Sequence, residues 1–189
     1  DDVPKSKQYV HSGWGTEDKQ FVLLHDEYDE FKGGLNTTVR IFSIEDLSNP
    51  VQVGQWTGPT PAIDHNGFVR GNRYYMSNYE RGLTILDITD PTKPTEAGFF
   101  DTFPPSNSDS FNGAWGVYPY LPSGNILVSD INSGLYVLKD NAKASTKGMF
   151  SFNSKSTQTA QGTTLSLSVQ RNAADAAQAT AVSYQIIQG

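Results

Sequence analysis

Two segments of this sequence repeat each other at a constant spacing. Residues 38–56 read TVRIFSIEDLSNPVQVGQW, and residues 82–100 read GLTILDITDPTKPTEAGFF. Corresponding positions, such as Pro50 and Pro94, lie 44 residues apart, and a third copy begins with GLYVL at residues 134–138. A period near 44 residues is typical both of β-propeller blades and of paired-helix repeats.

The chemistry of the repeated segments decides between these two architectures. Apolar residues alternate along each copy, as at Val39 and Ile41 or at Leu83 and Ile85, and each copy runs into an Asn-Pro or Lys-Pro turn. Alternation of β-branched residues before such turns is typical of strands. No stretch before residue 170 keeps a 3.6-residue apolar period long enough for a helix. The sequence therefore predicts an all-β fold with a partial β-propeller of about three four-stranded blades.

We expect four strands in each blade, ordered from an inner to an outer strand. The expected strands are 11 onward, 21–25, 38–44 and 51–56 in the first blade, then 65–70, 73–78, 83–88 and 95–100 in the second, and 115–120, 126–129 and 135–138 in the third. The third blade has no clear outer strand. Propellers generally close with about four to eight blades, so the remaining blades are expected from the parent chain or from another chain.

The composition changes after Lys139 and indicates a second region. We predict propeller blades in residues 1–139, a polar linker in residues 140–148 and a truncated β-sandwich segment in residues 149–189. Strand-like alternation at 150–152, 163–169 and 180–187 supports the sandwich prediction. The chain opens with Asp1-Asp2 and lacks a starting Met and a signal peptide, which we interpret as a segment of a longer protein.

Charge and cysteine content exclude several classes of function. The net charge of −6 leaves no basic face to neutralise phosphates, so no nucleic-acid partner is expected. Cysteine is absent, which excludes disulfides, a thiolate zinc site and a cysteine nucleophile. No apolar run approaches the roughly 18 residues of a membrane span. The sequence predicts a protein that can meet cations but does not cross a membrane.

Several polar motifs follow one another in an order that resembles a known family. They are HSGWGTED at 11–18, HDEYDE at 25–30, GPT at 58–60, AIDHN at 62–66, SNYERGL at 77–83, FNGAW at 111–115 and YP at 118–119. From residue 9 to 138 the chain resembles the bacterial secreted family with LVIVD-type propeller repeats, often called choice-of-anchor B. The resemblance implies a propeller in an exported bacterial protein, often attached to the cell surface through its C-terminal region. It implies no particular reaction.

The C-terminal region is similar to the start of a Calx-β domain. The matching residues are Gly162 and the Val-Gln-Arg sequence at 169–171. Gln161 stands where that family usually has a glutamate that binds calcium. This departure argues against a calcium site at that position.

Histidines and acidic residues recur at equivalent places in the blades. His11 and His65 each start an expected inner strand, and Asp26, Asn78 and Asp130 end the expected second strands. Such positions can converge on one face around the channel of a propeller, where imidazole nitrogens and carboxylate oxygens suit a divalent cation. The predicted metal ligands are His11, Asp26, Asp64, His65 and Asp130, and the predicted ion is Ca²⁺ or another divalent cation. Alternatively, these side chains hydrogen-bond a neighbouring strand and pin the blade.

Other polar and aromatic residues receive separate predictions. Trp14, Trp115 and Asn78 are predicted to bind a ligand at the channel, where an indole ring can stack on a sugar. Asp29 and Glu30 are expected in a solvated loop, and Asp46 and Asp90 are expected to cap turns. The remaining aromatic residues of the strands are expected in the core between blades; they are Trp56, Tyr74, Tyr75, Phe99 and Phe100.

Three hypotheses for function follow from these residues. The leading one is a secreted or cell-surface propeller of bacterial type that binds a protein or glycan ligand, or serves adhesion, with a divalent cation at its channel face. The second is a metal-assisted hydrolase or lyase in which His11 and His65 hold the metal and Asp26 or Asp64 acts as base. The third is a purely architectural spacer in a large surface protein. No Gly-x-Ser-x-Gly elbow is present, and no catalytic nucleophile is predicted.

Overall fold

The computed structural model describes residues 8–142, 149–152 and 169–172 of the chain. The chain divides into two compact units, residues 1–143 and 144–189. The elements of the first unit are β1 (Val10–Gly15), β2 (Phe21–Asp26), α1 (Glu27–Phe31), β3 (Thr38–Ser43), β4 (Val51–Thr57), β5 (Gly67–Arg70), β6 (Arg73–Asn78), β7 (Gly82–Asp87), β8 (Thr95–Phe100), β9 (Ala114–Tyr118), β10 (Asn125–Asp130) and β11 (Gly134–Lys139).

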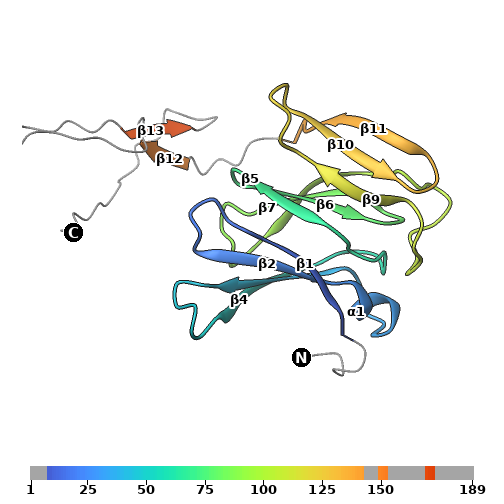
Figure 1. Cartoon of the computed structure of the whole chain (residues 1–189), viewed down its shortest axis with the longest axis horizontal. Helices are drawn as coiled ribbons and strands as arrows, with labels where there is room; N and C mark the ends of the chain where they lie inside the picture. Colours follow the sequence, from blue (N-terminus) through green and yellow to red (C-terminus); the bar gives the residue numbers. More distant parts are fainter. Residues whose placement is uncertain (1–7, 143–148, 153–168, 173–189) are drawn as a thin grey trace, which may run out of the picture. The chain divides into compact units, whose positions relative to one another are not determined.

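Three antiparallel sheets follow one another along the first unit (Figure 1). The first contains β1-β2-β3-β4, the second contains β5-β6-β7-β8, and the third contains β9-β10-β11. Each sheet pairs strands that are consecutive in the sequence, as expected for propeller blades. The prediction of an all-β fold is confirmed, and β6 and β8 have the predicted bounds. The third sheet has no outer strand among the described residues, also as predicted.

Apolar side chains fill the space between neighbouring sheets. One cluster joins the first two sheets and includes Leu23, Ile41, Trp56, Tyr74 and Leu86. A second cluster joins the second and third sheets; its members are Tyr75, Leu83, Ile85, Ala114, Val117, Ile126 and Val128. The core positions predicted for Trp56, Tyr74 and Tyr75 are confirmed. Phe99 and Phe100 of the outer strand β8 lie outside both clusters and are 56% and 43% exposed, although the Phe100 ring contacts Tyr136 of the third sheet at 5.8 Å.

The same pair of strand positions faces the next sheet in each blade. Val39 and Ile41 in β3 are fully buried, and the equivalent Leu83 and Ile85 in β7 are nearly so. In β11 the equivalent residues, Leu135 and Val137, are 64% and 58% exposed. The apolar face of the third sheet is thus uncovered among the described residues, as expected for a partial propeller that needs further blades.

The predicted turns between the last two strands of the first two blades are confirmed. Asp46 Oδ1 accepts a hydrogen bond from the backbone N–H of Ser48 at 2.9 Å, and Asp90 Oδ1 accepts one from Thr92 at 3.1 Å. A carboxylate that binds the N–H two residues later stabilises a tight turn.

The second unit contains β12 (Met149–Phe152) and β13 (Val169–Asn172), which pair in antiparallel orientation. Strand β12 includes the segment predicted at 150–152. The segment predicted at 163–169 overlaps β13 at Val169 alone, and its other residues and the segment at 180–187 lie outside the described residues.

Candidate metal centre

The start of α1 sets the position of Glu27. Strand β2 ends at Asp26, whose extended backbone and side chain form the N-cap of the helix. Asp26 Oδ1 accepts hydrogen bonds from the backbone N–H of Tyr28 at 3.1 Å and of Tyr9 at 2.6 Å. The backbone N–H of Glu27 also donates to Tyr9 O at 3.0 Å. These bonds satisfy free N–H groups of the first turn and hold Glu27 beside the start of β1.

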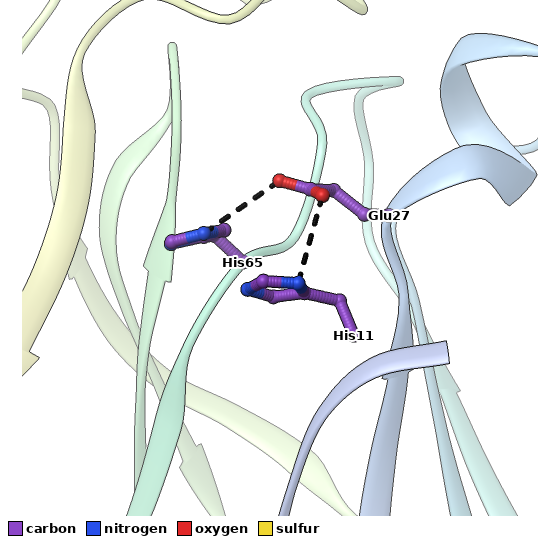
Figure 2. A group of neighbouring side chains, drawn as sticks. All are labelled: His11, Glu27 and His65. Carbon is purple, nitrogen blue, oxygen red and sulfur yellow. Dashed lines mark ion pairs between the residues drawn. The ribbon is translucent and has the colours of Figure 1, made fainter. Parts of the chain in front are cut away.

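Glu27 faces two histidines from two different sheets (Figure 2). His11 lies in β1, His65 lies two residues before β5, and these two strands are neighbours. Glu27 Oε2 lies 3.8 Å from His11 Nδ1, and Glu27 Oε1 lies 3.7 Å from His65 Nε2. The two imidazole rings stack with their centroids 4.5 Å apart. One ligand atom from each of the three residues lies within 4.8 Å of the others.

The hydrogen bonds of His65 indicate which ring nitrogen carries the proton. Its Nδ1 contacts the backbone carbonyl oxygen of Trp115, which can only accept. Nδ1 therefore carries the proton and donates, and Nε2 turns a lone pair toward Glu27. Asn66 Nδ2 lies 2.8 Å from this Nδ1 and 3.4 Å from the same carbonyl oxygen, so the tautomer requires the amide to be turned with its oxygen toward the ring. Two acceptors, His65 Nε2 and Glu27 Oε1, thus lie 3.7 Å apart with no proton of the ring between them.

Burial favours the neutral form of His65. It lowers the pKa of His65, and this effect exceeds the opposing effects of the Trp115 carbonyl and the Glu27 carboxylate. A neutral imidazole whose second nitrogen donates to a backbone carbonyl is the usual state of a histidine that binds a metal.

The donor set favours a transition metal ion over calcium. Two imidazole nitrogens and one carboxylate oxygen match zinc sites with an open position, whereas Ca²⁺ takes about six to eight oxygen ligands. Tetrahedral zinc with bonds of about 2.0–2.1 Å places its ligand atoms roughly 3.4 Å apart. Here the separations are wider: Glu27 Oε1 lies 3.7 Å from His65 Nε2, Glu27 Oε2 lies 3.8 Å from His11 Nδ1, and the three ligand atoms lie within 4.8 Å of one another.

Asp26 and Asp130 end the second strands of their sheets, as the repeat predicts, but both carboxylates accept backbone hydrogen bonds. Asp26 caps α1, as described above. Asp130 Oδ1 accepts from the backbone N–H of Asn132 at 2.9 Å and of Ser133 at 2.7 Å, and so closes the turn before β11. The structure places neither residue in the group formed by His11, Glu27 and His65.

Asn78 is fully buried and lies at the equivalent strand end in the second sheet. Its Nδ2 donates to the backbone oxygens of Ala62 at 2.8 Å and of Ile63 at 3.0 Å, and its Oδ1 accepts from Thr84 Oγ1 at 3.1 Å. These bonds hold the segment that leads to His65. The geometry gives Asn78 a positioning contact with this segment.

The two tryptophans have different neighbours. Trp115 stacks on His65, with centroids 5.6 Å apart and planes 18° apart, and half of its surface is exposed. Trp14 instead packs edge-on against Phe68 at 4.8 Å. Trp115 therefore lies next to the histidine and glutamate group, whereas Trp14 belongs to a separate aromatic cluster that continues from Phe68 to Tyr120.

The short helix α1 carries two further buried acids, Asp29 and Glu30. Asp29 and Glu30 are fully buried, so the prediction of a solvated loop is wrong. Arg40 Nη1 binds Asp29 Oδ2 at 2.6 Å, and Glu30 Oε1 accepts from the backbone N–H of Thr38 at 3.0 Å. The reason is the short helix: residues three apart share a helix side, so Glu30 follows Glu27 inward.

Asp64 interacts electrostatically with these buried acids. It is fully buried, and neither carboxylate oxygen has a hydrogen-bond partner among the described residues. Burial, followed by the charges of Asp64 and Asp29, raises the pKa of Glu30 far above its usual range. Burial also raises the pKa of Asp64. Asp64 therefore interacts with the acids behind the site and does not join His11 and His65.

His25, which precedes the acidic run, is fully buried. Its Nε2 lies 2.6 Å from the hydroxyl of Tyr74, and its Nδ1 lies 3.3 Å from the backbone oxygen of His65. Burial lowers the pKa of His25 to about 3, so the ring stays neutral at physiological pH. The His25 ring, from the first sheet, thus contacts both Tyr74 in the second sheet and the backbone of His65.

Two residues of the site were not predicted from the sequence. Glu27 lies in the acidic run that the sequence singles out, one position beyond the predicted Asp26. Tyr79, in the turn between β6 and β7, donates its hydroxyl proton to Glu27 Oε1 at 2.8 Å. The motif SNYERGL contains this tyrosine, but its partner is 52 residues away and no local pattern indicates the contact.

Comparisons with known proteins support the assignment of the second sheet as a blade. The LVIVD repeat family model matches residues 68–102, which span β5 to β8. A search of curated proteins finds no match. The solved structure of Sqt1 from Saccharomyces cerevisiae resembles this chain with a TM-score of 0.46 and 10% sequence identity, over 78% of this chain and 39% of Sqt1. The chain thus spans about two-fifths of that protein.

No helix in the described part of the chain is long and apolar enough to cross a membrane. The chain thus contains one LVIVD repeat, at residues 68–102, and the order of strands in its three sheets fits a partial β-propeller.

Proposed function

We propose that these blades belong to an extracellular binding propeller that holds a zinc-type divalent ion at His11, Glu27 and His65. The observation that carries this proposal is the three-residue group itself, in which one carboxylate faces two stacked imidazoles and the ligand atoms lie within 4.8 Å of one another. The hydrogen bond from His65 Nδ1 to Trp115 supports it, because such bonds orient metal-binding histidines.

Three protein ligands leave at least one coordination position for a ligand from solution. His11 is partly exposed, and the exposed rings of Tyr9 and Trp115 lie next to His11 and His65 respectively. A protein or glycan ligand can therefore bind the ion through an oxygen and pack on an aromatic ring. A secreted or cell-surface scaffold of this kind agrees with the LVIVD repeat.

The contacts of the two candidate bases support binding over hydrolysis. A general base must reach the water bound to the metal, directly or through one water. Asp64 is fully buried, and Asp26 is engaged as a helix cap. Neither joins the group formed by His11, Glu27 and His65.

The uncovered face of the third sheet supports a further part of the proposal. Leu83 and Ile85 pack on the following sheet, and their equivalents Leu135 and Val137 offer the same apolar surface. We propose that another blade, from the same polypeptide or another chain, covers this face. The site does not depend on it, because all three ligands come from the first two sheets and their connections.

Isothermal titration of the chelator-treated chain with Zn²⁺ tests the metal site. We expect one ion per chain, no binding to the His11→Ala, His65→Ala double variant, and at least tenfold weaker binding to Glu27→Gln. Glu17→Gln is the matched control, because the amide oxygen can still accept the bond from Gly71 at 2.7 Å, and its affinity should not change. Tighter binding of Ca²⁺ than of Zn²⁺, or Zn²⁺ binding that survives in the double variant, would contradict the proposal.

A further inference from the structure

The side chain of Tyr79 joins the metal ligand Glu27 to the ring of His65. Its hydroxyl donates to Glu27 Oε1 at 2.8 Å, and its ring packs against His65 with centroids 5.1 Å apart. Phe111 packs edge-on against the phenol ring at 5.2 Å. Two ring contacts therefore restrict the orientation of the phenol, and its hydroxyl donates to one carboxylate oxygen.

The backbone of Tyr79 adopts a conformation that a tyrosine rarely takes. Its φ is 27°, in the left-handed region that favours glycine. Such a residue costs about 1–3 kcal/mol and persists only where its surroundings impose it. Here the backbone oxygen of Tyr79 accepts from Gly82 N and from Ala114 N, each at 2.9 Å. The strained turn is thus held from the second sheet and from the third.

Gly113 allows the third sheet to approach this turn. A Cβ at Gly113 would lie 2.3 Å from the backbone oxygen of Tyr79, and Gly113 itself has φ 82°. Only glycine fits both the conformation and the contact. The close approach brings β9 against Tyr79, and the same strand provides the Trp115 carbonyl that binds His65.

We propose that Tyr79 is a positioning residue that makes Glu27 a ligand through Oε2 alone. This inference rests on the proposed metal site. The hydroxyl occupies Oε1, and Oε2 is left free toward His11 at 3.8 Å. Carboxylates that bind metals are themselves hydrogen-bonded, and loss of such a partner typically weakens metal binding 10–100-fold. Tyr79 holds the carboxylate in place before the ion arrives, so the ion does not have to order it.

The test compares Tyr79→Phe with the unaltered chain, using Zn²⁺ titration and the visible absorption spectrum of bound Co²⁺. The substitution keeps the ring packing and removes only the hydroxyl. We expect Zn²⁺ binding to weaken at least tenfold and the Co²⁺ bands to change, because the freed carboxylate can bind through both oxygens. Tyr120→Phe is the matched control: it also loses a hydrogen bond from a phenol, to Val69 O at 2.7 Å, and should leave both readouts unchanged.

A double-mutant cycle separates positioning from a general loss of stability. If Tyr79 acts through Glu27, adding Tyr79→Phe to Glu27→Gln weakens Zn²⁺ binding by much less than it does in the unaltered chain. Equal losses in both backgrounds, or unchanged affinity and spectrum in Tyr79→Phe, would overturn the role of Tyr79 while the metal site stands. Absence of Zn²⁺ binding in the unaltered chain would overturn the proposed function and this inference together.

Discussion

The Gly82→Ala variant should lose at least about 3 kcal/mol of unfolding free energy, whereas Gly134→Ala should lose about 1 kcal/mol. The two glycines are the first residues of β7 and β11, and their φ angles are 86° and 89°. Because both φ angles are positive and nearly equal, alanine is strained to the same extent at either position. The difference in unfolding free energy between the two variants therefore depends on the atoms that surround each glycine.

The surroundings differ because the second sheet has an outer strand. A Cβ at Gly82 would lie 2.2 Å from the backbone oxygen of Phe100 and 2.6 Å from the backbone nitrogen of Thr102. Backbone atoms cannot rotate away as a flexible side chain can, so the end of β8 would have to move. A Cβ at Gly134 meets no described atom within 4 Å.

Urea unfolding of both variants beside the unaltered chain measures the two losses. Equal losses would contradict the expectation in one of two ways. A small loss in both variants would show that the end of β8 moves easily. A large loss in both would show that a strand covers β11 in solution, as β8 covers β7.

The strands were predictable because their signals are local. Alternating apolar residues and Asp-initiated turns occur within about ten residues of each other, and a repeated pattern reinforces them. The bounds of β6 and β8 agree with the prediction for this reason. The buried faces of β3 and β7 follow from the same alternation.

The carboxylate that faces the histidines was not predictable in the same way. The repeat register selects Asp26, and this residue does end β2, but it caps a helix that the register does not contain. The change from strand to helix turns Glu27 toward His11 and carries Glu30 inward. A shift of one residue separates the helix cap from the carboxylate that faces the histidines, because neighbouring side chains point in different directions.

The contacts that complete the site are long-range. Tyr79 and Glu27 are 52 residues apart, and His65 and Trp115 are 50 residues apart. A repeat predicts which strands are equivalent, but it does not predict which connecting turns meet. The strained φ of Tyr79 and the glycine that admits β9 depend on the packing of two sheets.

Glu30→Gln should make the chain more stable than the unaltered protein by about 4 kcal/mol at pH 7.5, with little difference at pH 4. Burial and the charges of Asp64 and Asp29 raise the pKa of Glu30, so the folded state keeps its proton at neutral pH. The unfolded chain releases that proton above about pH 4.5. The glutamine amide keeps an oxygen for the bond from Thr38 and carries no charge.

The direction of the pH dependence follows from the proton count. Between about pH 4.5 and the raised pKa of the folded state, the folded chain binds one more proton than the unfolded chain. Stability therefore falls as pH rises, by about 1.4 kcal/mol per pH unit for this one group. Glutamine cannot ionise, so the variant should lose this part of the slope, and its advantage should grow from pH 5 to pH 7.5.

Urea unfolding at pH 4, 5, 6 and 7.5 tests this expectation, with Glu45→Gln as a control that removes the same charge from an exposed position. The control should change stability by less than about 0.5 kcal/mol at every pH. A variant less stable than the unaltered chain at pH 7.5 would mean that folded Glu30 is ionised. Its charge beside Asp64 would then have to be neutralised by a bound cation, since Arg40 is already paired with Asp29. The sign of the difference at pH 7.5 thus decides whether protons or a cation balance the buried acids.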